Sequence, residues 1–311
     1  MPAPTTDFAR TAAWPPLPLE AWRDTYATLH MWLQVVGKTR LALAPMENHW
    51  WQVALYVTPR GLTTSAMPTD TRTLAADFDF LDHQLYLRLS DGATRAIPLA
   101  PRSVADFYAA YRDALRSLGV EARIRPVPVE VERAIPFPED REHDAYDPGA
   151  AARCWQILVQ VDRVLKRFRG RFLGKASPVH FFWGSFDMAA TRFSGRTAPL
   201  HPGGAPNCPD YVMHEAYSHE CSSCGFWPGG GAIAAPAFYA YAYPEPPGYA
   251  DHPVRPDGAY YSREAREFIL PYEAVRAAAA PDDAILDFYQ STYEIVADLG
   301  HWDRAALDRP A

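Results

Sequence analysis

The stretch PVHFFWGSFDMAATRFSG, residues 178–195, decides the fold class, because its β-branched and aromatic runs predict a β-hairpin. A second stretch of the same character, HWWQVALYVTPRGLTTSAM at residues 49–67, has turn residues at 59–61. Residues 74–99 continue as a meander, in which the sequence SDG at 90–92 supplies a turn that needs positive φ. Antiparallel sheets are therefore expected in both parts of the chain.

Helices are expected on either side of these strands. Apolar residues recur at three- and four-residue steps over residues 22–36, and Pro45 ends this helix at the latest. Residues 103–119 form a second helix with Ser103 as its N-cap and Gly119 after its end. Further helices are expected at residues 151–172, after Asp147 as N-cap and Pro148 at N1, and at 284–300. Further strands are expected at 236–243 and 266–272.

The order helix, hairpin, meander, helix occurs twice along the chain. Residues 106–108 (DFY) recur at 287–289, and residues 49–51 (HWW) correspond to 180–182 (HFF). We therefore predict an α+β fold made of two duplicated halves, in which each antiparallel sheet is flanked by helices. The halves are residues 1–130 and 131–311, and the second carries a loop insertion at 195–236.

Composition excludes several classes of protein. The chain has 311 residues, a net charge of −7 and no basic stripe, so neither nucleic acid nor a membrane is expected as a partner. The N-terminus lacks a basic start followed by an apolar run, and no apolar stretch reaches about 20 residues, so neither a secretory signal nor a membrane span is expected. Four cysteines are too few for a disulfide scaffold. A cytoplasmic protein is predicted, and its oligomeric state stays open.

Four motifs carry a resemblance to a known family. They are HWWQVALYVTPRGLTTS, SPVHFFWGSFDMAATRFSGR, EAYSHECSSCGFWPGGG and PAFYAYAYPEPPG. With them the chain resembles an uncharacterised bacterial family known only as a domain of unknown function, from about Trp14 to Trp302. This resemblance implies no activity, cofactor or catalytic residue.

The stretch HEAYSHECSSCGFWPGGG, residues 214–231, concentrates groups that bind metals. Zinc would need four ligands, which His214, His219, Cys221 and Cys224 could supply. However, the two histidines are five residues apart, and no second C-x-x-C pair faces the cysteines. No helix starts after the cysteines either, as a redox motif would require. Neither a metal nor a cofactor is predicted.

A long loop in this stretch could instead close over a ligand, with PGGG at residues 228–231 as its hinge. The alternative is that Phe226 and Trp227 only plug the end of the second sheet. The strand at 238–243 places Tyr239, Tyr241 and Tyr243 on one face, where they could line a pocket or lie under a helix.

Three other groups have a structural and a functional interpretation. His180 shares its face with Phe182 and has a counterpart in His49, which favours a packing role for both histidines. Asp187, Arg192 and Arg196 could bind an anion or form solvated ion pairs. The chain contains no G-x-S-x-G, Walker A or G-x-G-x-x-G motif.

We therefore predict a small-molecule-binding protein, which could be an enzyme that uses acid–base chemistry in an aromatic pocket of the second half. His219 would transfer the proton, and Glu220 or Glu215 would orient it or act as a base. The residues expected to bind the ligand are Arg192 as an anion anchor, Trp183, Tyr217, Trp227, Tyr239 and Tyr241. The alternative is a non-catalytic scaffold whose aromatic groove binds a partner protein.

Overall fold

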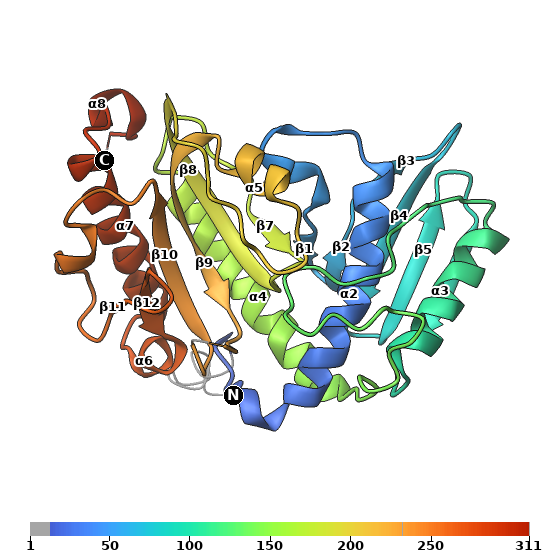
Figure 1. Cartoon of the computed structure of the whole chain (residues 1–311). Helices are drawn as coiled ribbons and strands as arrows, with labels where there is room; N and C mark the ends of the chain where they lie inside the picture. The colour runs from blue at the N-terminus through green and yellow to red at the C-terminus, as the bar shows by residue number, and fades with distance from the viewer. Residues whose placement is uncertain (1–12, 232, 311) are drawn as a thin grey trace.

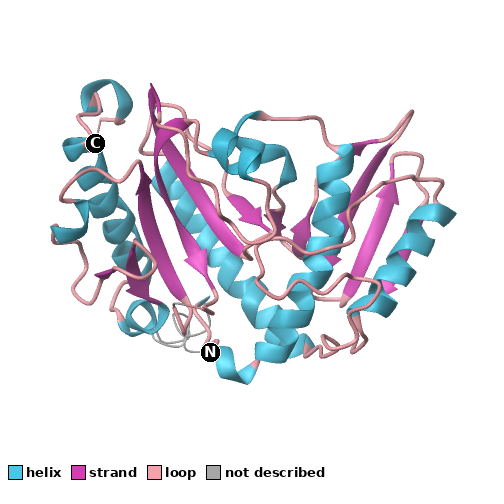
Figure 2. Ribbon diagram, viewed as in Figure 1, coloured by secondary structure: helices cyan, strands magenta, loops and turns pink. Residues whose placement is uncertain are grey.

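Two antiparallel six-stranded sheets form the framework of the computed structural model, which describes residues 13–231 and 233–310 (Figures 1 and 2). The first sheet has the strand order β1-β2-β4-β5-β6, with β3 paired to β4. Its strands are β1 (Tyr56–Thr58), β2 (Gly61–Thr63), β3 (Met67–Pro68), β4 (Thr73–Asp79), β5 (Gln84–Leu89) and β6 (Thr94–Pro98). The second sheet has the order β11-β12-β10-β9-β8-β7. Its strands are β7 (His180–Phe182), β8 (Asp187–Thr197), β9 (His219–Trp227), β10 (Ala237–Tyr243), β11 (Tyr260–Ser262) and β12 (Glu267–Pro271).

Helices cover one face of each sheet, which confirms the predicted α+β class. The long helices are α2 (Arg23–Leu43), α3 (Val104–Ser117), α4 (Pro148–Arg169) and α7 (Pro281–Leu299). The short ones are η1 (Leu19–Ala21), η2 (Asn48–Val53), α5 (Asp210–Ala216), η3 (Tyr249–Asp251), α6 (Tyr272–Ala277) and α8 (Arg304–Leu307). Helices α4 and α7 pack on the second sheet, and α2 lies between α3 and α4.

The predicted turn and cap residues occupy the expected positions. Ser103 caps α3 by accepting a hydrogen bond from the backbone N–H of Asp106 at 3.1 Å, and Gly119 follows the helix with φ 68°. Asp147 caps α4, in which proline occupies the first turn. The hairpins β1–β2 and β7–β8 are both present.

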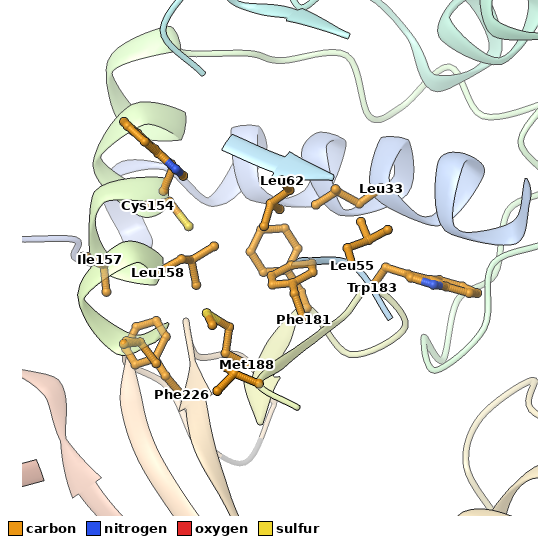
Figure 3. Close-up of a cluster of buried hydrophobic side chains, with 14 of the residues drawn as sticks. Leu33, Leu55, Leu62, Cys154, Ile157, Leu158, Phe181, Trp183, Met188 and Phe226 are labelled. Carbon is orange, nitrogen blue, oxygen red and sulfur yellow. The ribbon is translucent and has the colours of Figure 1, made fainter. Parts of the chain in front are cut away.

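The two sheets meet along their edge strands. Leu55, next to β1, exchanges two backbone hydrogen bonds of 2.9 Å with Phe181 of β7. Side chains from both halves pack together at this junction: Leu62 of the first half lies near Phe181 and α4 (Figure 3). One continuous apolar core therefore joins the halves.

The two halves share an order of elements. Each runs from a long helix through a six-stranded antiparallel sheet to a second long helix, and the DFY triplets lie on α3 and α7. Duplication remains a prediction, but one of its residue correspondences is wrong. Residues 49–51 lie in η2, whereas residues 180–182 form β7, so His49 and His180 are not equivalent.

Regular structure makes up about half of the predicted loop at residues 195–236, namely the end of β8, α5 and β9. Residues 219–227 form β9, a strand in the middle of the second sheet. The expectation of a long surface loop is therefore wrong for this segment, in which residues 221–226 are all buried. Irregular segments remain at 198–209, which leads to α5, and at 228–231, which follows β9.

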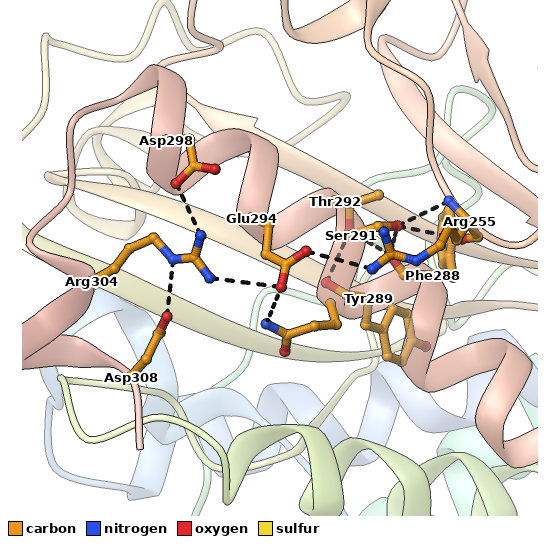
Figure 4. A network of polar contacts seen from close by, with 10 residues as sticks. Arg255, Phe288, Tyr289, Ser291, Thr292, Glu294, Asp298, Arg304 and Asp308 are labelled. Carbon is orange, nitrogen blue, oxygen red and sulfur yellow. Dashed lines mark hydrogen bonds and ion pairs between the residues drawn. The ribbon is translucent and has the colours of Figure 1, made fainter. Parts of the chain in front are cut away.

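At the C-terminus, Arg304 holds α8 against the end of α7 (Figure 4). Its guanidinium lies 3.0 Å from Asp298, 3.0 Å from Asp308 and 3.6 Å from Glu294, and Glu294 also pairs with Arg255 at 3.5 Å. These five residues are called the Arg304 network below.

No helix in the described part of the chain combines the length and apolar character needed to cross a membrane. The expectation about a secretory signal concerns the first residues of the chain, and residues 1–12 lie outside the described ranges.

Candidate functional site

The face of the second sheet opposite α4 and α7 carries the candidate site. The strand register places Asp187 of β8, Gly225 of β9 and Tyr239 of β10 on this face. The residues that alternate with them point into the core, as Phe226 and Phe238 do with exposures of 0%. Strand periodicity thus separates an apolar face from a polar, aromatic one.

A cleft of about 730 Å³ opens on this face. This volume is in the usual range for small-molecule sites. Its charged lining consists of the carboxylates Asp187, Glu245 and Glu267 and the guanidinium Arg266. Its aromatic lining consists of His201, Tyr217, Trp227, Tyr239, Tyr241 and Tyr243.

Asp187 lies at the inner end of the cleft and is 9% exposed. The hydroxyl of Tyr239 donates a hydrogen bond to one of its carboxylate oxygens, and that of Ser185 donates to the other at 2.5 Å. Burial raises the pKa of Asp187 above its ordinary value, although these two hydrogen bonds oppose the rise. The carboxylate is therefore held in a fixed position by neutral donors.

Gly225 allows Tyr239 to reach Asp187. Tyr239 pairs with Gly225 on β9, which in turn pairs with Ala189 on β8. A Cβ at residue 225 would lie 2.5 Å from the Tyr239 hydroxyl and 1.9 Å from the carbonyl oxygen of Met188. Only glycine lets the tyrosine side chain cross this strand.

Glu267 supplies a second carboxyl group to the cleft. Its side chain has no hydrogen bond or ion pair within the described ranges. Burial, and then the charge of Asp187, raise the pKa of Glu267 to about 7. A group with this pKa can both give and accept a proton near neutral pH.

A smaller chamber of about 220 Å³ adjoins the cleft under α5 and η2. Five residues line both spaces: Ser185, Asp187, Tyr217, Tyr239 and Tyr241. The Tyr217 and Tyr241 hydroxyls are 2.7 Å apart and hydrogen-bonded. This pair of tyrosines forms part of the wall between the two spaces.

Residues of the first half of the chain line one side of the chamber. His49 hydrogen-bonds through Nδ1 to the carbonyl oxygen of Ala216 at the end of α5, at 2.9 Å. Its Nε2 is 2.9 Å from the ammonium group of Lys175, so Nε2 accepts and Nδ1 donates. The Trp50 ring lies 5.8 Å from the ring of Tyr211 on α5. The first half therefore helps to build the site of the second.

Glu130, in the segment between the two halves, extends its carboxyl group into the chamber lining. Burial and then the charge of Asp187 raise the pKa of this carboxyl group to about 7, although the residue as a whole is exposed. A Cβ at residue 184 would lie 2.1 Å from the Glu130 carboxylate, so Gly184 makes room for it.

Strained backbone is concentrated around the two spaces. Among the described residues, nine non-glycine residues have positive φ, and four of them line the cleft or chamber: His49, Trp50, Glu130 and Arg266. Such conformations cost about 1–3 kcal/mol each and gather at functional sites. The strain supports a functional role for this region.

Four of the predicted ligand-binding residues, Tyr217, Trp227, Tyr239 and Tyr241, line the cleft. Arg192 does not, because it points into the helix-covered core and is 1% exposed. There its guanidinium lies 3.6 Å from the centre of the Phe168 ring and donates to the Phe168 carbonyl. The proposed anion anchor is therefore a core residue.

Trp183 also lies outside both spaces. Its indole N–H donates to the carbonyl oxygen of Val53 at 2.7 Å, and its ring covers Gly37. A Cβ on Gly37 would lie within 2.4 Å of that ring. Trp183 thus packs β7 and its turn against α2.

The predicted proton-transfer group and its partners lie outside the linings of both the cleft and the chamber. His219 begins β9, with its ring 5.5 Å from that of His49. Glu220 accepts hydrogen bonds from Arg196 at 2.6 Å and from Ser194 at 2.8 Å. Glu215 lies on α5. The Arg196–Glu220 pair agrees with the ion-pair interpretation of Arg196.

The four residues considered as candidate metal ligands do not form a common site among the described residues. Cys221 faces the chamber, whereas Cys224 faces the core, because residues three apart on a strand point in opposite directions. No group of three or more His, Cys, Asp or Glu suited to a metal is present among residues 13–231 and 233–310. His180 is 1% exposed, and both its ring nitrogens lack a hydrogen-bond partner. Burial lowers its pKa to about 3.

Sequence reasoning missed most of the polar lining: Ser185, His201, Glu245, Arg266 and Glu267. Tyr243 is part of the lining, as one of the three tyrosines that strand alternation placed on a common face of β10. The missed residues come from β12 and from connecting segments, whose positions depend on the strand order of the second sheet.

Concave clefts that are lined by aromatic rings and a few polar groups are a common form of small-molecule site. The chain belongs to a family of unknown function, DUF5996, whose model matches residues 14–309. No curated protein and no solved structure matches the chain.

Proposed function

We propose that this chain binds a small molecule in the cleft and that Glu267 exchanges a proton with it. One observation carries the proposal: the unpaired Glu267 carboxyl group, with a pKa of about 7, lines a cavity beside the fixed carboxylate of Asp187. Two carboxyl groups in different environments can divide acid–base work between them. Glu267 takes the role first given to His219.

The surroundings of Asp187 define its part in this proposal. Tyr239 and Ser185 each donate to one of its carboxylate oxygens, so Asp187 keeps a fixed position. From there it would orient the ligand and stabilise charge on it. Its negative charge also raises the pKa of Glu267 toward neutral pH. Four free cysteines support a reducing, cytoplasmic location, which is part of the proposal.

The concave form of the site favours a small molecule over a partner protein. A protein-binding groove would present its aromatic rings on an open, flat patch. Here Tyr239, the inner of the tyrosines on β10, is 8% exposed and bonds to the carboxylate at the end of the cleft.

The test is a metabolite screen by thermal unfolding, followed by variants of the cleft. A ligand that binds the folded state raises the unfolding temperature. Asp187→Asn and Tyr239→Phe should lose most of that rise, whereas Glu264→Gln, an exposed residue outside the cleft lining, should keep it. A full rise in both cleft variants would place the ligand elsewhere.

If the ligand is converted, its rate should depend on a group with a pKa near 7. Glu267→Gln should abolish that dependence and lower kcat by about 100-fold or more. An unchanged rate and pH profile in Glu267→Gln would remove Glu267 from the proposed role.

A further inference from the structure

The charges of the cleft lining are unbalanced. Asp187, Glu245 and Glu267 supply three carboxyl groups, whereas Arg266 supplies the one guanidinium of the lining. His201 adds no lasting positive charge, because burial lowers its pKa below the ordinary value. The lining is therefore acidic whenever its carboxyl groups are ionised.

None of the three carboxylates is paired with a cation within the described ranges. Among the described residues, no ion pair within 4.0 Å joins a Lys, Arg or His nitrogen to Asp187, Glu245 or Glu267. The hydrogen-bond partners of these carboxylates are neutral hydroxyl groups. Tyr239 and Ser185 donate to Asp187, and Tyr261 donates to Glu245 at 2.5 Å. A buried carboxylate such as Asp187 is costly without an opposite charge.

Aromatic rings surround the same space. Tyr239 and Tyr241 stack at 6.1 Å, and His201 stacks on Tyr217 at 4.6 Å. The faces of tyrosine and tryptophan rings attract organic cations. Carboxylates and ring faces together favour an ammonium group over a neutral or anionic one.

A metal ion is a poorer match for this charge. Mg²⁺ and Ca²⁺ need several oxygen ligands around one point. Within residues 13–231 and 233–310, no three His, Cys, Asp or Glu converge in that way. Carboxylates that are separated along an aromatic cleft suit a larger, organic cation.

We infer that the ligand of the cleft is an organic amine or quaternary ammonium compound, whose positive charge lies between Asp187 and Glu267. This inference rests on the proposed function and specifies its ligand class. The cleft volume of about 730 Å³ is sufficient for an amine with an attached ring or chain.

The test compares amines with uncharged molecules of nearly the same shape. The probe pairs are 2-phenylethylamine with 2-phenylethanol, cadaverine with pentane-1,5-diol, and choline with 3,3-dimethylbutan-1-ol. Calorimetric titration at low salt and pH 7.5 gives the Kd of each. At least one amine should bind about tenfold more tightly than its alcohol. Equal binding within all three pairs, or no amine with a Kd below about 10 mM, overturns the inference.

Variants of the cleft carboxylates test which of them lies next to the positive charge of the amine. Glu267→Gln should weaken binding of the amine by about tenfold and leave binding of the alcohol unchanged. Glu264→Gln should change neither Kd. Glu245→Gln provides a second cleft variant if Glu267→Gln does not fold. An amine that binds Glu267→Gln, or Glu245→Gln if Glu267→Gln does not fold, like the wild type overturns the inference.

The two proposals can fail separately. If the alcohols or 3-phenylpropionate bind as well as the amines, and Tyr239→Phe removes that binding, the cleft remains the site and the cation class is wrong. If neither these probes nor any screened metabolite depends on the cleft residues, both proposals are wrong.

Discussion

Two acidic clusters in the second half of the chain differ in one respect. In the Arg304 network, the carboxylates of Glu294, Asp298 and Asp308 share the guanidinium of Arg304 (Figure 4). In the cleft, Asp187 and Glu267 have no cationic partner among the residues that the structure describes. The carboxylates of the Arg304 network have a cationic partner within the chain, whereas those of the cleft do not among the described residues.

The clusters also differ in what surrounds them. The side chains of Arg304 and Glu294 are 35% and 33% exposed, so water screens their charges. Asp187 is 9% exposed and lies against rings and hydroxyls, where an isolated charge interacts strongly. The difference teaches that the partly exposed cluster fastens α8, whereas the buried cluster retains unpaired charge, which the proposed ligand would neutralise.

The largest effect should follow from removing the shared cation. Arg304→Met leaves three carboxylates without their common partner and should lower the free energy of unfolding by about 2 kcal/mol. Urea unfolding followed by circular dichroism measures this change. The control is Arg263→Met, which breaks one exposed pair with Asp251 and should cost less than about 0.5 kcal/mol. Equal losses in the two variants would mean that the network adds nothing to a single surface pair.

Removing a charge from the cleft should raise the free energy of unfolding, whereas removing Arg304 should lower it. Glu267 has a pKa of about 7 in the folded chain, against an ordinary value of 4.5. It therefore holds its proton more tightly in the folded than in the unfolded chain, and stability is lost as the pH rises from about 4.5 to about 7. Glu267→Gln carries no charge at any pH, so it should be about 1 kcal/mol more stable than the wild type at pH 8 and equal to it at pH 4.

Urea unfolding of both proteins at the two pH values measures this difference. Glu130 also has a raised pKa, but it is present in both proteins and cancels in the comparison. Glu264→Gln should show no such dependence on pH. A Glu267→Gln variant that is less stable at pH 8 would mean that the carboxylate has a stabilising partner.

Much of the fold could be predicted from the sequence, because its signals are local. Ser103 and Asp147 marked helix starts through capping chemistry, and the turn residues near Gly61 and Gly92 marked hairpins. The strand 219–227 was missed because its polar residues, glycine and cysteines resemble a loop. Its burial between β8 and β10 comes from the tertiary arrangement, which overrides local propensity.

The candidate site could be predicted in part. Alternation along one strand correctly placed Tyr239 and Tyr241 on a common face. It could not show that Asp187 lies on this face and Arg192 on the opposite one, because that depends on which side of β8 the helices cover. Glu130 and Glu267 are 137 positions apart in the sequence, and only the folded chain brings them to either side of Asp187.

The smallest expected effect concerns the wall between the cleft and the chamber. The hydrogen bond of 2.7 Å between Tyr217 and Tyr241 joins two neutral groups, so it adds little to stability beside the charged pairs of the Arg304 network. Tyr241→Phe removes the bond but keeps the ring, and it should lower the free energy of unfolding by about 0.5–1 kcal/mol. Tyr243→Phe is the matched control, since it loses a bond of 3.1 Å to the carbonyl oxygen of Pro199 at the exposed end of the same strand, and its cost should be smaller. Urea unfolding of the two variants measures both costs. Because neither change alters the charge of the cleft, both variants should keep the preference for amines over alcohols, and a loss of that preference in Tyr241→Phe would assign cation recognition to the tyrosine hydroxyls rather than to Asp187 and Glu267.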